Sequence, residues 1–99
     1  MRVELFYFDG CPNWTVAEDR LTEALLAVGR DDITLERRKV ETPAAARAAG
    51  FTGSPTIRID GRDPFAPGNE PVGMSCRVYP TPDGLSGTPT LDQFIEVLS

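Results

Sequence analysis

The chain has 99 residues with 10 basic and 15 acidic side chains, which gives a net charge of −5. This length suits one modest hydrophobic core, so we expect residues 1–99 to form a single domain. An acidic chain without a basic cluster is a poor match for a nucleic-acid backbone. The longest apolar run is too short to span a membrane, and the N-terminus does not read as a signal peptide. We therefore expect a cytoplasmic protein that binds neither nucleic acid nor membrane.

The chain contains two cysteines and no histidine, and this limits its chemistry. Two cysteines do not make the disulfide framework of a small secreted protein, nor a tetrahedral zinc site without other ligands. The absence of histidine excludes Ser-His and Cys-His nucleophilic pairs. Chemistry must then use a thiol, a carboxylate or backbone dipoles, and we expect no metal ligands and no bound cofactor.

The nearly continuous apolar run Val3–Phe8 is typical of a strand that is buried on both faces and lies centrally in a sheet. From Trp14 to Val28, apolar residues recur at spacings of three and four, which predicts an amphipathic helix. Gly29 then ends that helix, since glycine is favoured just past a helix C-terminus. The sequence thus predicts a strand and a helix joined by a short turn.

Cys11 lies in that turn, between the strand and the helix. Unpaired backbone N–H groups and the helix dipole at a first turn favour a thiolate, which is the reactive form of cysteine. Pro12 suits the first helical position, and the N–H groups of Asn13 and Trp14 would stabilise the thiolate. We expect an exposed Cys11 thiol with a lowered pKa, although the Asp9 carboxylate opposes that shift. The alternative is that Cys11 is a small apolar residue in a turn.

The rest of the chain predicts seven further segments. Thr42 is a good N-cap for a short helix at 44–49. Thr90 and Gln93 can form a capping box at the start of a C-terminal helix at 91–98. In order, the segments are a charged edge strand (33–40), a helix (44–49), a strand (57–60) after Gly53-Ser54-Pro55-Thr56, a proline-rich loop (62–73), a short strand (76–79), and a loop (80–87) leading to a C-terminal helix (91–98). The order β-α-β-α-β-β-α predicts an α/β fold with a mixed four-stranded sheet, whose last two strands form an antiparallel hairpin.

This order of elements, with Cys11-Pro12-Asn13-Trp14 and Ser54-Pro55-Thr56, resembles the thioredoxin/glutaredoxin-like fold family over essentially the whole chain. The resemblance implies that Cys11 is the catalytic nucleophile and that Trp14 shields it. It also implies that Ser54, Pro55 and Thr56 form a cis-proline loop that faces Cys11 and holds substrate by strand addition. In that topology the third strand runs antiparallel to the first, so Pro55 lies beside Cys11.

The chain departs from the family where Trp14 replaces the second cysteine of the Cys-x-x-Cys motif. That thiol normally releases the mixed disulfide, so the resemblance implies a monothiol variant in which a small thiol such as glutathione completes the reaction. Cys76 is the possible second thiol. In the predicted hairpin Cys76 comes three residues before Tyr79, which places it roughly 10 Å farther than Tyr79 from the cysteine turn. A disulfide needs Cα atoms within about 7 Å. We therefore expect no Cys11–Cys76 bridge, with the reservation that the proline-rich loop can reposition residues 73–76.

The sequence leaves three functions open. The first is thiol–disulfide exchange, or adduct formation with a small thiol, through Cys11. The second is a non-catalytic module that binds a peptide in the same groove. The third is capture of a soft metal or an iron–sulfur cluster by Cys11, either within one chain or across a dimer. The expected partner is a disulfide-containing protein or a small thiol, and the expected state is a monomer or a weak homodimer.

Overall fold

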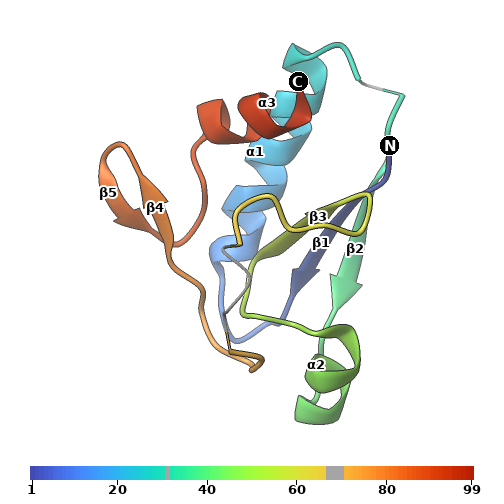
Figure 1. Cartoon of the computed structure of the whole chain (residues 1–99), viewed down its shortest axis with the longest axis vertical. Helices are drawn as coiled ribbons and strands as arrows, with labels where there is room; N and C mark the ends of the chain where they lie inside the picture. The colour runs from blue at the N-terminus through green and yellow to red at the C-terminus, as the bar shows by residue number, and fades with distance from the viewer. Residues whose placement is uncertain (31, 67–70) are drawn as a thin grey trace.

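In the computed structural model, which describes residues 1–30, 32–66 and 71–99, the apolar N-terminal run forms the central strand β1, Val3–Tyr7. It pairs in parallel with β2, Leu35–Lys39, and antiparallel with β3, Thr56–Ile59. The sheet order is β2-β1-β3 (Figure 1). The predictions of a buried central strand and a charged edge strand are therefore confirmed.

Two helices pack on one face of this sheet, and the short third helix contributes its buried Ala46 to the core on the other face. Helix α1, Asn13–Ala27, and helix α3, Leu91–Leu98, lie side by side on one face, and helix α2, Pro43–Ala49, lies toward the opposite end of the sheet (Figure 1). Residues from β1, β3, α1 and α3 form the larger core, which also includes Tyr79. Phe6 faces the other way and packs with Val40, Ala46 and Phe51 of the α2 side. Successive residues of a strand point to opposite faces, so β1 contributes to both cores.

Local sequence signals set the helix ends. Thr42 caps α2 by accepting a hydrogen bond from the Ala45 N–H at 3.0 Å, and Gly50 ends it in the left-handed conformation at φ 63°. Thr90 and Gln93 form the expected capping box at the start of α3. Gly29, with φ 75°, follows the C-terminus of α1. None of the helices in the described ranges is long and apolar enough to cross a membrane.

The predicted four-stranded sheet is wrong for the part of the chain that the structure describes. The last strands form a separate two-stranded sheet from β4, Tyr79–Thr81, and β5, Gly84–Ser86, which lies to one side in Figure 1. The loop expected at 80–87 is therefore a hairpin. Its signal is the sequence Thr81-Pro82-Asp83-Gly84, because proline at the second position and glycine at the fourth favour a type I turn. Residues 76–78 do not pair with β3, and part of the predicted 62–73 loop lies outside the described residues.

Candidate functional site

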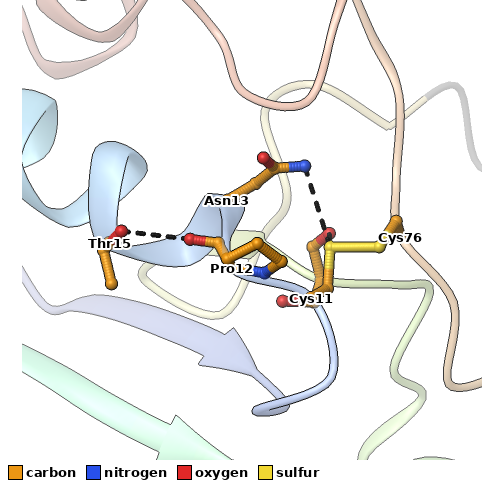
Figure 2. Close-up of a disulfide and its surroundings, with 6 residues drawn as sticks. Cys11, Pro12, Asn13, Thr15 and Cys76 are labelled. Atoms are coloured by element: carbon orange, nitrogen blue, oxygen red, sulfur yellow. Dashed lines mark hydrogen bonds between the residues drawn. A yellow bond between two sulfur atoms is a disulfide. The ribbon is translucent and has the colours of Figure 1, made fainter.

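A disulfide joins Cys11, at the end of the turn before α1, to Cys76, with their Cα atoms 5.7 Å apart (Figure 2). The prediction that the two cysteines do not bridge is therefore wrong. It assumed that Cys76 lies in a hairpin with β3, which would have set it back from Cys11. The segment Gly73–Arg77 instead runs beside residues 51–54 and brings Cys76 to the start of the helix.

The backbone of Ser54 holds the Cys76 segment through a single parallel β-bridge. The Ser54 N–H donates to the Ser75 carbonyl oxygen at 2.8 Å, and the Arg77 N–H donates to the Ser54 carbonyl oxygen at 2.9 Å. These two bonds lie on either side of Cys76, which forms a parallel bridge with Ser54. Strand addition at Ser54 was expected for a substrate, and in this structure the chain's own segment occupies that position.

Gly53 permits this close approach. Its φ of 114° belongs to a region that side chains rarely adopt, and a Cβ placed on it would lie 3.0 Å from the Ser75 carbonyl oxygen and 3.1 Å from the Arg77 Cβ. Glycine therefore meets a conformational need and a packing need at one position.

Side-chain contacts anchor the same segment on the far side of Cys76. Arg77 is 8% exposed, forms an ion pair with Asp63, and lies over the Tyr79 ring at 4.4 Å from its centre. The Tyr79 hydroxyl donates to the Pro55 carbonyl oxygen. The residues that follow Cys76 are thus tied both to the loop after β3 and to the proline loop before it.

The proline loop has the conformation that the resemblance implies. The Ser54–Pro55 peptide bond is cis, which confirms the sequence prediction, and Ser54, Pro55 and Thr56 are all buried. The Cys11 Sγ lies 3.7 Å from the Ser54 carbonyl oxygen although 43 positions separate the two residues. The Ser54 hydroxyl is buried and has no hydrogen-bond partner among the described residues. The antiparallel pairing of β1 with β3 produces this neighbourhood, as expected.

The two ends of the disulfide differ in exposure. Cys11 has no exposed surface, so the prediction of an exposed Cys11 thiol is wrong, whereas Cys76 is exposed. The docked segment and the proline loop cover Cys11. The Asn13 side-chain amide lies 3.7 Å from the Cys11 Sγ and can donate to it (Figure 2). Pro12 takes the N-cap position, one residue before the position predicted for it.

Gly87 makes room for the Asn13 amide. A Cβ on Gly87 would lie 2.2 Å from the Asn13 Nδ2, and this glycine does not have a positive φ. The segment Gly87-Thr88-Pro89-Thr90, which leads into α3, therefore packs against the first turn of α1. Sequence reasoning assigned only the Asn13 backbone a role, because nothing in the spacing links Gly87 to Asn13.

Trp14 lies on the same turn, and its ring contacts are with the sheet. It stacks on the Tyr7 ring with centroids 4.3 Å apart, and the Arg37 guanidinium lies 5.2 Å from its centre. It also packs against the larger core. These contacts give Trp14 a packing role, and its expected shielding of Cys11 stays a prediction.

A lysine neutralises the acidic residue beside the cysteine turn. The Lys39 ammonium lies 2.7 Å from the Asp9 carboxylate, and this hydrogen-bonded pairing raises the pKa of Lys39 above its ordinary value. The sequence showed no basic residue near Cys11, because Lys39 comes from β2, where it is in register with Tyr7. The Asp9 charge is therefore a weaker obstacle to a Cys11 thiolate than the sequence alone indicates.

The described residues contain no group of three or more His, Cys, Asp or Glu side chains placed to hold a metal ion. In the disulfide form both sulfurs are bonded to each other, so neither is available as a thiolate ligand.

Comparison with known proteins finds no matching family model, no matching curated protein and no matching solved structure.

Proposed function

We propose that this protein is a thioredoxin-like thiol–disulfide exchange protein whose redox pair is Cys11 and Cys76. The observation that carries the proposal is the disulfide between a cysteine at a helix N-terminus and an exposed cysteine, beside a cis-proline loop. The resolving thiol missing from position 14 comes instead from a distant segment. This replaces the monothiol mechanism that the sequence suggested.

The reaction moves two electrons. Reduced protein and a substrate disulfide give the Cys11–Cys76 disulfide and two substrate thiols, through one mixed disulfide. The reverse reaction oxidises a substrate dithiol. Glutathione or a protein dithiol is a suitable reductant for the oxidised form.

Three features support a redox role over a purely structural disulfide. Exposed disulfides are the ones that thiols can attack, and Cys76 is exposed. A thiolate leaving at Cys11 would remain beside the first turn of α1 and the Asn13 amide, which stabilise negative charge. In addition, the bonds that anchor Ser75 and Arg77 do not depend on the disulfide, so the thiols would stay close after reduction.

The experiment has two parts. Oxidised protein is equilibrated in glutathione buffers of graded potential, and free thiols are counted while circular dichroism monitors folding. Reduction of a protein disulfide is then followed with dithiothreitol as electron source, using Cys11→Ser and Cys76→Ser as controls. We expect reversible opening in the folded state, and catalysis that both substitutions abolish. A disulfide that opens only when the protein unfolds would refute the proposal.

The second candidate function is a non-catalytic binding module in which the disulfide is a structural staple. The burial of Cys11 and the 65-residue separation of the two cysteines favour it, since a bridge across a long loop strongly constrains the unfolded chain. It predicts a disulfide that resists reduction in the folded state, so the same titration separates the two functions.

A further inference from the structure

We infer that Cys76, and not Cys11, is the sulfur through which the protein exchanges thiols with its partner. This inference rests on the proposed function. It reverses the roles expected from the position of Cys11 at the helix start, where Cys11 would be the nucleophile and Cys76 the second thiol. Its basis is the difference in exposure across one bond: the whole Cys11 residue is buried, and Cys76 is exposed.

Contacts other than the disulfide close access to Cys11. The Ser54 carbonyl lies 3.7 Å from the Cys11 Sγ on one side, and the Asn13 amide lies at the same distance on another. Figure 2 shows the Cys11 sulfur between the first turn of α1 and the Cys76 segment. A cavity of about 290 Å³ lies beside Gly10, but none of the described residues that line it is a cysteine.

Cys76 is an exposed residue that adjoins space for a partner chain. A cavity of about 410 Å³ adjoins Cys76, and its walls include Phe65, Val78, Tyr79 and Pro80. Val78 is 57% exposed, so the surface beside Cys76 is partly apolar. An incoming cysteine on a peptide can therefore place its neighbouring residues in this cavity while its sulfur meets Cys76.

A partner thiolate attacks the Cys76 sulfur, the Cys11–Cys76 bond breaks, and a bond between Cys76 and the partner sulfur forms. Cys11 leaves as a thiolate at the N-terminus of α1, where the helix dipole and Asn13 stabilise it; a better-stabilised thiolate is a better leaving group. A second thiolate of the partner then attacks the partner sulfur and releases Cys76 as a thiolate, which leaves the partner oxidised and this protein reduced. In the opposite direction Cys76 is the nucleophile and Cys11 is the resolving thiol.

The test locates the first adduct. Oxidised protein is treated with less than one equivalent of glutathione, quenched with acid, alkylated at free thiols, and mapped by mass spectrometry after digestion. We expect glutathione on Cys76 and the alkyl group on Cys11, with at least a tenfold preference. The matched control is the same oxidised protein in guanidinium chloride, where both sulfurs are exposed and the preference should fall close to one.

A second measurement uses the single-cysteine variants with oxidised glutathione. The Cys76 thiol in Cys11→Ser should form the adduct at least tenfold faster than the Cys11 thiol in Cys76→Ser, because the segment that covers Cys11 remains docked. Glutathione found mainly on Cys11 of the folded protein would overturn this inference and leave the proposed function standing. Absence of any adduct on folded protein, with normal reaction in guanidinium chloride, would remove the proposed function itself.

Discussion

Gly53 and Ser75 approach so closely that a single methyl group on Gly53 would lie 3.0 Å from the Ser75 carbonyl oxygen. That carbonyl accepts the Ser54 N–H, and the next residue is Cys76. The distance between the two cysteines thus depends on a position that carries no side chain.

Gly53→Ala should destabilise the protein by about 1–3 kcal/mol, from backbone strain at positive φ and from displacement of Ser75. It should also slow closure of the disulfide after reduction. Gly61→Ala is the matched control, because Gly61 has φ 83° but no described atom within 4 Å of an added Cβ. Urea unfolding and the rate of thiol loss under oxidised glutathione measure the two effects. Equal closure rates in the two variants would contradict the role given to the Gly53 contact.

Opening the disulfide should lower the free energy of unfolding by about 4 kcal/mol, since it releases a constraint across 65 residues in the unfolded chain. Denaturant unfolding with and without reductant measures this difference. A variant with both cysteines replaced by serine should match the reduced wild type and show no response to reductant. A reduced form as stable as the oxidised form would show that the loop-closure argument fails here.

Asn13→Ala should raise the pKa of the Cys11 thiol when measured in a Cys76→Ser background, because it removes a donor to the thiolate. Gly87→Ala should raise the same pKa although residue 13 remains asparagine, because the new methyl group displaces the Asn13 side-chain amide. The alkylation rate against pH gives both values. Unchanged profiles in both variants would leave the helix dipole as the source of any thiolate stabilisation.

Asp63→Ala should cost about 3–5 kcal/mol, because it leaves the Arg77 guanidinium buried without its ion-pair partner. The control is Glu18→Ala, whose partner Arg37 has a side chain that is 55% exposed. That substitution should cost no more than about 1 kcal/mol. Thermal and urea unfolding of the two variants compare them directly, and similar losses would argue against the anchoring role of Arg77.

Trp14→Ala should destabilise the protein by about 3–5 kcal/mol, since it removes the stacking on Tyr7 and part of the core packing. Where the variant folds, its disulfide should still join Cys11 to Cys76, because Trp14 belongs to neither anchoring segment. Trp14→Phe retains an aromatic ring and should recover most of the stability. Loss of the disulfide in folded Trp14→Phe would assign Trp14 a role at the redox site.

The parts of the fold with local signals were predictable. The apolar run of β1, the periodicity of α1, and the Thr42 and Thr90 caps each depend on residues close in sequence. The cis bond at Pro55 was expected from the family resemblance. The docking of Gly73–Arg77 depends on Gly53, Arg77 and Asp63, which lie far apart and show no shared spacing. The pattern of residues 76–79 predicted a strand of the sheet. A short segment with an apolar residue near a cysteine has the same pattern in a hairpin strand and in a docked loop, so the sequence does not distinguish them. The pairing of Cys11 with Cys76 was missed for that reason.

Trp14 is the only tryptophan in the chain and lies three residues after Cys11, on the first turn of α1. Disulfides quench nearby indole fluorescence by accepting an electron from the excited ring. The intrinsic emission of the unlabelled protein should therefore report whether the cysteine pair is open or closed. A stopped-flow mixing experiment can then follow each redox half-reaction on a single optical signal, without a dye or a coupled assay.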